Sequence, residues 1–228
     1  MPSGNLIARL FVQTAVTLAV MAALLFVPAG TWRWPQAWWL LAIFLLGTAY
    51  FGAFLLRRDP ALLESRLGGP VQKDQPLWDR LFLGAVMIGW CAWLAFMAWD
   101  ARARHGAPMP GWLEILGGVL IAGGFLGIMP VFAANSFAAP TVRVQSEQRV
   151  IDTGPYAHVR HPMYATALLY LIGMPLLLGS WWGLIGTAII ALAISWRAVG
   201  EENTLARELP GYADYMKRVR WRLVPGVW

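Results

Sequence analysis

The chain has 228 residues, of which 58% are hydrophobic and only 13% are charged, with 14 Trp and a mean hydropathy of +0.54. A water-soluble domain usually carries about 25% charged residues. This composition therefore excludes a water-soluble domain and predicts an all-α, multi-pass transmembrane protein. The net charge is +6, but the sequence shows no water-soluble basic surface that could bind nucleic acid, so we expect no nucleic-acid partner. The single Cys91 excludes an intramolecular disulfide. His158 and His161 have no third His or Cys nearby, so we expect no metal.

Five segments without Asp, Glu, Lys or Arg reach or approach the ~20 residues that cross a bilayer. They are 10–32, 34–56, 81–99, 115–142 and 161–196. The first four predict long helices at about 6–27, 36–56, 77–100 and 111–135, the first one retained in the protein and ending before Pro28. The fifth is long enough for two passes and predicts a helical hairpin that turns at 179–183. Residues 57–76 are expected to be a cytoplasmic loop or a helix lying on the membrane surface.

The positive charges favour one orientation. With the N-terminus in the cytoplasm, 15 of the 18 Lys and Arg residues lie inside, and Arg33, Arg102 and Arg104 lie outside. Cytoplasmic loops are enriched in Lys and Arg, so we expect cytoplasmic N- and C-termini, an even number of passes and a cytoplasmic tail helix. Arg outnumbers Lys by 16 to 2, which is typical of a GC-rich genome and suggests a bacterial inner membrane.

Two patterns concern packing. Tryptophans at the outer end of the second helix predict an aromatic belt: Trp32, Trp34, Trp38 and Trp39. Glycines at three- and four-residue spacing in the fourth helix allow close helix approach: Gly117, Gly118, Gly123, Gly124 and Gly127. We expect a single integral-membrane domain over 1–228, with helices up to 135 and a site-bearing region over 136–228.

The polar segment 136–160 is too short to be a domain. Its apolar residues, such as Val150 and Ile151, alternate with polar ones such as Arg149, which predicts extended backbone lying against the helices. Extended backbone offers free N–H and C=O groups that can bind an adenine or a carboxylate. An ordinary cytoplasmic connector is the alternative.

A cluster of polar side chains precedes the hairpin: Tyr156, Arg160, His161 and Tyr164. Pro162 fits the first turn of a helix, whose N-terminus presents free N–H groups and a positive dipole end to a carboxylate. His161 and Tyr164 lie three residues apart and share a helix face. Headgroup anchoring explains a lone His or Tyr at this depth, whereas the cluster favours a binding site.

The second arm of the hairpin ends in polar residues as well. Arg197 and Glu201 are spaced to pair on one helix face, and Glu202 follows. Because a hairpin returns its second arm to the start of the first, we expect Arg197 and Glu201 beside His161 and Tyr164. A snorkelling Arg and a solvated acidic pair are the alternative. A positive helix end, tyrosines and a carboxylate together suit a small zwitterionic, adenine-bearing molecule.

These motifs resemble those of a known family. The resemblance is carried by Gly154-x-Tyr156, Arg160-His161-Pro162-x-Tyr164, Glu201-Glu202-x-x-Leu205, Tyr212-x-x-Tyr215 and Val219. Ordered over 141–224, they are similar to the isoprenylcysteine carboxyl methyltransferases, integral-membrane enzymes that overlap in pattern with the phospholipid methyltransferases. The family usually has Gly where this chain has Thr166, a side chain that could narrow the cofactor pocket and that leaves the acceptor open.

The resemblance implies S-adenosylmethionine as methyl donor and a lipophilic acceptor that enters from the lipid bilayer between helices. It implies that Arg197 orients the acceptor and serves catalysis. It also implies a set of cofactor-binding residues: Gln145, Gln148, Arg149, Val150, Ile151, Tyr156, His161, Pro162, Met163, Tyr164, Glu201 and Glu202. The sequence shows no obvious catalytic base, which favours an isoprenoid-type carboxylate or thiol acceptor over a phospholipid amine.

Two other classes stay open. An NADPH-dependent membrane reductase of the sterol-reductase type carries a similar Arg-His-Pro-x-Tyr motif, but would be favoured by more transmembrane segments and a further acid. A non-enzymatic membrane or transport subunit would string its intramembrane polar residues along a path, not gather them at one face. The sequence leaves the oligomeric state open.

Overall fold

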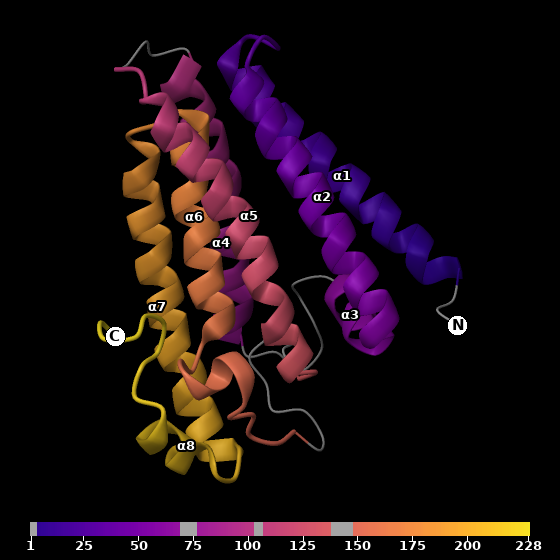
Figure 1. The fold of residues 1–228 in the computed structure, drawn as a ribbon, viewed down its shortest axis with the longest axis vertical. Helices are drawn as coiled ribbons and strands as arrows, with labels where there is room; N and C mark the ends of the chain where they lie inside the picture. Colours follow the sequence, from indigo (N-terminus) through magenta and orange to yellow (C-terminus); the bar gives the residue numbers. More distant parts are fainter. Residues whose placement is uncertain (1–3, 69–76, 103–106, 138–147) are drawn as a thin grey trace.

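The computed structural model describes residues 4–68, 77–102, 107–137 and 148–228, which form a bundle of helices (Figure 1). Its elements are α1 Gly4–Ala29, α2 Pro35–Arg58, α3 Pro60–Leu67, α4 Leu77–Arg102, α5 Gly111–Ala134, the 3₁₀ turn η1 Gly154–Ala157, α6 Pro162–Leu178, α7 Gly183–Glu208 and α8 Tyr212–Arg218. The predicted all-α, multi-pass architecture is confirmed, and within the described ranges the chain forms no strand.

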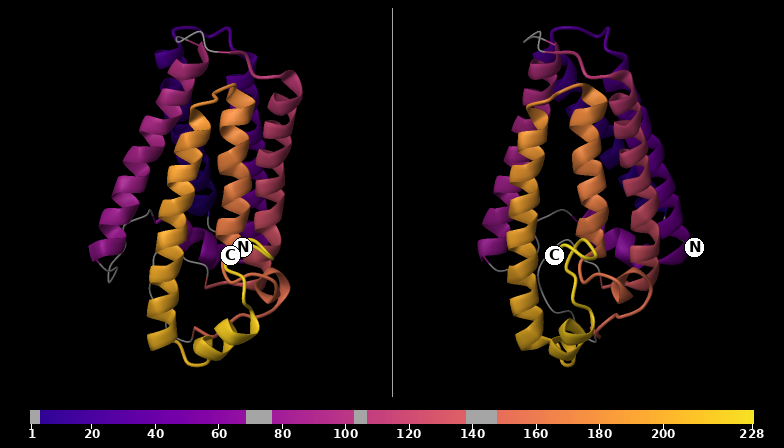
Figure 2. Two further views of the ribbon diagram at one scale, coloured as in Figure 1. Left: turned by 90° about the vertical axis from the view of Figure 1, so that its left-hand side faces the viewer. Right: turned by 60° about the vertical axis from the view of Figure 1, so that its left-hand side comes forward.

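Five helices are long and apolar enough to cross a membrane in the described part of the chain: α1, α2, α4, α5 and α7. The 17 residues of α6 are apolar but extend only about 25 Å, somewhat less than a typical hydrocarbon core. α6 and α7 form the predicted hairpin (Figure 2). Its arms are unequal, because α7 continues for 26 residues to Glu208 and carries its polar end beyond the start of α6.

The end of α1 was predicted wrongly. The helix runs through Pro28 to Ala29, because a proline in the last turn removes only one backbone hydrogen bond. Gly30 then ends the helix with a positive φ of 65°, and its N–H donates to the carbonyls of Phe26 and Val27 at 3.1 and 3.2 Å. Such a left-handed glycine is a common helix terminator.

The expected tryptophan belt needs one correction. Trp32, Trp38 and Trp39 are exposed, whereas Trp34 is only 1% exposed and belongs to the apolar core. The Trp38 indole donates to the Trp32 carbonyl at 3.0 Å, and both rings pack on Phe26. The belt therefore consists of three rings that cover the turn between α1 and α2, while the fourth closes the core beneath it.

The closest helix pair is α5 with α6, and glycines make it possible. A Cβ on Gly117 would lie 2.6 Å from the Gly173 carbonyl oxygen and 2.4 Å from the Leu177 nitrogen. A Cβ on Gly124 would lie 3.1 Å from the Thr166 carbonyl oxygen, whereas one on Gly123 would meet nothing within 4 Å. The predicted role in close approach is confirmed for Gly117 and Gly124, and Gly123 does not share it.

The start of α1, the C-terminus, α3, α8 and the start of α6 lie at the same end of the bundle (Figures 1 and 2). The turns between α1 and α2 and between α6 and α7 lie at the other end. The polar residues singled out by the sequence therefore gather at the end where α1 begins and the C-terminal tail lies, which is where a site served by water-soluble ligands can form.

We expect Gly117→Ala to destabilise the protein strongly, because the new methyl group would collide with the α6 backbone; overpacking of this kind typically costs about 1–3 kcal/mol. Gly123→Ala is the matched control and should be neutral or slightly stabilising. Thermal unfolding of both variants in detergent, followed by tryptophan fluorescence, tests this. Equal midpoints for the two variants would contradict the packing described.

Candidate functional site

The start of α6 is held by the C-terminal tail. Backbone N–H groups of Arg160 and His161 donate to the carbonyls of Trp221 and Arg222, both at 2.9 Å. The Arg160 guanidinium also donates to the carbonyls of Val219 and Arg220 at 2.7 and 2.9 Å. A segment about 60 residues later in the chain therefore fixes the segment that leads into α6.

Glu202 is the ionic centre of this junction. It is only 3% exposed, and its carboxylate accepts from Arg160 Nε at 2.6 Å and from Arg222 Nε at 2.9 Å. His161 Nε2 lies 3.2 Å from the same carboxylate. Glu202 was expected to bind cofactor, but it is not among the residues that line the cavity described below. Its contacts join α7 to the start of α6 and to the tail.

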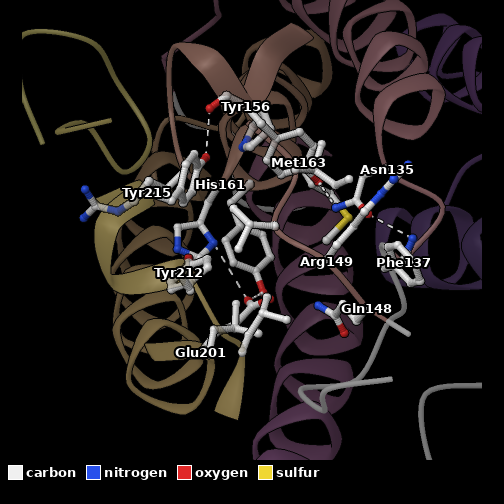
Figure 3. A pocket seen from close by; sticks show the side chains of 17 residues that line it. Asn135, Phe137, Gln148, Arg149, Tyr156, His161, Met163, Glu201, Tyr212 and Tyr215 are labelled. Carbon is white, nitrogen blue, oxygen red and sulfur yellow. Dashed lines mark hydrogen bonds and ion pairs between the residues drawn. The ribbon is translucent and has the colours of Figure 1, made fainter. Parts of the chain in front are cut away.

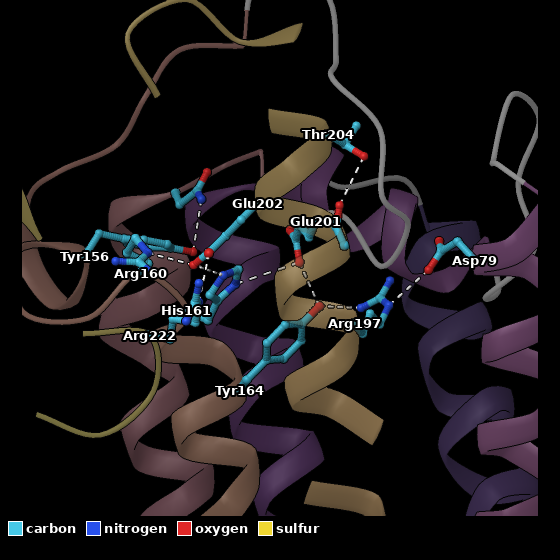
Figure 4. A network of polar contacts seen from close by, with 12 residues as sticks. Asp79, Tyr156, Arg160, His161, Tyr164, Arg197, Glu201, Glu202, Thr204 and Arg222 are labelled. Atoms are coloured by element: carbon cyan, nitrogen blue, oxygen red, sulfur yellow. Dashed lines mark hydrogen bonds and ion pairs between the residues drawn. The ribbon is translucent and has the colours of Figure 1, made fainter. Parts of the chain in front are cut away.

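A second group of polar contacts crosses from α4 to α7 (Figure 4). Arg197 Nε donates to Asp79 Oδ1 at 3.0 Å, and its Nη1 donates to the Tyr164 hydroxyl. That hydroxyl donates in turn to Glu201 Oε2 at 2.9 Å. The expected direct pairing of Arg197 with Glu201 is therefore replaced by a bridge through Tyr164, because Asp79 draws the guanidinium toward α4.

The expected gathering of the hairpin ends is confirmed. His161 and Tyr164 stack with ring centroids 5.4 Å apart and 9° between planes, and His161 Nδ1 lies 3.8 Å from Glu201 Oε2. The two groups of contacts thus meet at the His161 ring, which touches Glu202 on one side and faces Glu201 on the other.

A polar cavity opens beside this network (Figure 3). Seventeen residues line it: Asn135, Phe137, Gln148, Arg149, Val150, Ile151, Tyr156, Arg160, His161, Pro162, Met163, Tyr164, Glu201, Leu205, Leu209, Tyr212 and Tyr215. Ten of the twelve residues expected to bind cofactor are therefore brought to one cavity. Glu202 lies behind its wall, and Gln145 lies outside the described residues.

The tyrosines of the cavity are neutral hydrogen-bonding groups. Burial raises the pKa of Tyr156 to about 12, and its hydroxyl accepts from Asn135 Nδ2 at 3.0 Å. Burial also raises the pKa of Tyr212 and of Tyr215, and the Tyr215 hydroxyl donates to the Tyr156 carbonyl at 2.8 Å. The carboxylate of Glu201 therefore faces aromatic rings that carry no competing charge.

This donor set fits a cationic nucleoside such as S-adenosylmethionine. The Glu201 carboxylate and the faces of the tyrosine rings can stabilise a cation. The amide groups of Gln148 and Asn135 can hydrogen-bond a purine or a ribose. Arg149, which also lines the cavity, offers a guanidinium to the carboxylate of the ligand. The cavity encloses about 90 Å³, below the roughly 300 Å³ at the lower end of ligand pockets. S-adenosylmethionine is larger than this volume, so the described residues would enclose only part of the molecule.

A larger cavity, the apolar cavity, adjoins the polar one. It encloses about 670 Å³ between α1, α2, α4, α5 and α6, with Arg66 of α3 at its wall. Met163 lines both cavities. Thr166, at the position where the family usually has Gly, lines the apolar cavity and not the polar one, and its methyl group packs toward Gly127. The Thr166 side chain therefore shapes the apolar cavity and does not narrow the polar one.

Several residues of the site were not found from the sequence. One is Asp79, which is fully buried. Another is Asn135, whose side chain donates to the Tyr156 hydroxyl. In the sequence, Asp79 and Arg80 directly precede the uncharged run 81–99, a position typical of a charge at the membrane interface. Tyr212 and Tyr215 contribute to the resemblance but had been given no role. No local pattern ties these residues to the hairpin, since their contacts arise only when α4, α5 and α8 pack together.

The chain is an integral-membrane protein with a polar cavity that meets an apolar one. Comparison with known proteins narrows the class: residues 112–210 match the model of the phospholipid methyltransferase family. This match covers α5 to α7, includes most of the polar site, and confirms the resemblance seen in the motifs. A membrane methyltransferase is the class that it supports.

Two curated relatives share a similar stretch. One is the cobalt-zinc-cadmium resistance protein CzcN of Cupriavidus metallidurans, 30% identical over 104 residues, covering 44% of this chain and 47% of the relative. The other is the nickel-cobalt-cadmium resistance protein NccN of Alcaligenes xylosoxydans xylosoxydans, 28% identical over 103 residues, covering 43% and 47%. The chain spans about half the length of the curated relatives it matches.

We expect Glu202→Ala to destabilise the fold, because Glu202 does not line the polar cavity but holds Arg160 and His161, which do. The substitution leaves two buried or half-buried guanidiniums without their carboxylate, and breaking such a buried ion pair typically costs about 3–5 kcal/mol. Limited trypsin digestion should then cut the tail near Arg220 faster, together with a lower melting midpoint. Glu208→Ala, an exposed change on the same helix, is the control; equal digestion rates in the two variants would refute a clamping role.

Proposed function

We propose that this chain transfers the methyl group of S-adenosylmethionine to a lipophilic acceptor. The observation that carries the proposal is the junction at Met163, where a polar cavity with a carboxylate and tyrosine rings meets an apolar cavity of about 670 Å³. The family match over 112–210 supports the same class. The cofactor, when bound, supplies an electrophilic methyl group on a sulfonium cation.

The residues of the chain then have distinct tasks. Glu201 holds the positive charge or the ribose hydroxyls of the cofactor, and Tyr164 fixes the Glu201 carboxylate by its hydrogen bond. Tyr156, Tyr212 and Tyr215 enclose the nucleoside side of the polar cavity. The apolar walls align the acceptor and exclude water, and alignment of two reactants can supply several kcal/mol of the barrier.

Arg197 takes a supporting position in this scheme. It was expected to orient the acceptor, but its guanidinium is held by Asp79 and Tyr164, and it is not among the residues that line either cavity. We therefore propose it as a positioning residue that holds the Tyr164 hydroxyl in place for Glu201.

The acceptor that we favour is an isoprenoid-type carboxylate or thiol, because a carboxylate is methylated without losing a proton and a thiol reacts as the thiolate, having given up its proton before the transfer. A phospholipid amine is the second candidate, favoured by the family match over 112–210. An amine must release a proton during the reaction, and Glu201 and His161, which both line the polar cavity, are the groups placed to accept it.

We further propose that the site faces the cytoplasm of a bacterial cell. The start of α1 and the C-terminus lie at the same end of the bundle as the site (Figure 1), and 15 of the 18 Lys and Arg residues belong to that end in the expected topology. S-adenosylmethionine is made in the cytoplasm, so this orientation gives the cofactor direct access to the polar cavity.

Isothermal titration of the detergent-purified protein with S-adenosylhomocysteine tests the proposal. We expect micromolar binding, weakened about tenfold or more in Glu201→Gln, because the substitution removes a charged hydrogen-bond acceptor and keeps the shape. Glu208→Gln is the matched control on the same helix and should bind like the wild type. NADPH is titrated alongside: binding of NADPH and not of the nucleoside would establish the reductase class instead, and binding of neither would favour a non-enzymatic protein.

Thr166→Ala should leave the affinity for S-adenosylhomocysteine unchanged within about twofold. The Thr166 hydroxyl donates to the Met163 carbonyl at 2.9 Å, and the side chain borders the apolar cavity only. The same titration checks this, with Tyr156→Phe as the comparison that does alter the polar wall. A marked change in affinity for Thr166→Ala would place this side chain against the cofactor.

A further inference from the structure

Tyr170 carries a buried hydroxyl that forms no hydrogen bond. Among the residues that the structure describes, its oxygen is the one buried side-chain nitrogen or oxygen atom without a partner. Nearly all buried polar atoms in native proteins are paired, so such an exception calls for an explanation. A phenylalanine would fill almost the same volume and leave no polar atom unpaired. A hydroxyl at this position is therefore best explained by a ligand that supplies the partner.

Tyr170 lies on the wall of the apolar cavity. Four residues of α6 border that cavity at spacings of three and four residues, which places them on one face of the helix: Met163, Thr166, Ala167 and Tyr170. Met163 also lines the polar cavity. Tyr170 follows it by seven residues, and its position is therefore about 10 Å further along α6. An occupant that extends from the junction of the two cavities along α6 passes the Tyr170 ring.

The ring of Tyr170 is held by other aromatic rings of the same cavity wall. Trp90 of α4 stacks on it, with ring centroids 5.6 Å apart and 12° between planes. Phe125 of α5 meets it edge-on at 6.0 Å, and Phe44 of α2 lies at 5.8 Å. These neighbours pack the ring but offer its hydroxyl no oxygen or nitrogen acceptor. The Thr166 hydroxyl, one turn earlier in α6, does have a partner, because it donates to a backbone carbonyl at 2.9 Å.

We propose that Tyr170 recognises the acceptor by donating a hydrogen bond to an oxygen atom within the apolar part of that molecule. This inference rests on the proposed function and narrows its substrate class. Beside its reactive head, the acceptor would carry a carbonyl or ether oxygen about 10 Å from the junction of the two cavities. The ester carbonyl of a phospholipid can meet this requirement. An isoprenoid-type acceptor meets it only with an oxygen substituent on its chain.

Cys91 offers a readout that needs neither cofactor nor turnover. It is the single cysteine of the chain, it lines the same apolar cavity, and it follows Trp90 directly in the sequence. Occupants of the cavity should protect it from alkylation by N-ethylmaleimide, measured by intact-mass spectrometry in a neutral detergent. Three uncharged probes of nearly equal length are compared at equal mole fraction: heptadecane, dioctyl ketone and octyl nonanoate.

In the wild type we expect the ketone or the ester to protect Cys91 at a concentration about fivefold lower than heptadecane, which is the effect of one neutral hydrogen bond. Better protection by the ester assigns an ester-linked lipid as acceptor, and better protection by the ketone assigns an oxygen-substituted chain. Tyr170→Phe should abolish the preference for oxygen-bearing probes and keep the protection by heptadecane. Tyr50→Phe, an exposed change in α2, is the matched control and should keep the preference.

The same variant separates a ligand-binding role from a structural one. Without any probe, Tyr170→Phe should melt at the wild-type midpoint or slightly above it, because the hydroxyl that it removes has no partner in the described structure. A clearly lower midpoint would reveal a structural partner and contradict the proposal.

Three results of the alkylation assay would overturn the proposal: equal protection by all three probes in the wild type, protection by none of them, or a preference for oxygen that survives in Tyr170→Phe. Titration with S-adenosylhomocysteine on the same preparations separates this inference from the proposed function. Failure of that titration sinks the methyltransferase, while the Cys91 readout still decides whether the apolar cavity binds an oxygen-bearing lipid.

Discussion

The site depends on the Tyr164 hydroxyl, which accepts from Arg197 and donates to Glu201. Arg197 is in turn fixed by the fully buried Asp79. Buried charges are tolerated only when they are paired and hydrogen-bonded. Here each side chain, from Asp79 through Arg197 and Tyr164 to Glu201, is hydrogen-bonded to the next. α4, α6 and α7 are thereby tied together at one end of the bundle, and Glu201 is presented to the polar cavity in one orientation.

A second constraint is steric. α5 and α6 approach so closely at Gly117 and Gly173 that no side chain fits between them. The close pair leaves the space on its other side to α1, α2 and α4, where the apolar cavity lies. Met163, in the first turn of α6, then separates a polar cavity from an apolar one by a single side chain. In the proposed function, this boundary is where the donor and a lipophilic acceptor would meet.

Packing separates Arg197, which was expected to orient the acceptor, from both cavities. Arg197 is engaged within the helix network, whereas Arg66 borders the apolar cavity. Thr166 lines the apolar cavity, although a position next to the Arg-His-Pro-x-Tyr motif predicts contact with the cofactor. In the proposed function, the apolar cavity would receive the acceptor, while the polar residues of the motif would bind the donor.

Composition and hydrophobic run lengths determined the membrane class, the long helices and the hairpin, because the bilayer fixes the length and apolarity of any helix that crosses it. The hairpin also brought Glu201 to Tyr164, as its geometry requires. Tertiary structure alone decided which charge pairs with which: Asp79 diverts Arg197 from Glu201, and the tail engages Glu202. These partners lie 20 to 118 residues apart in the sequence, and no local periodicity encodes them.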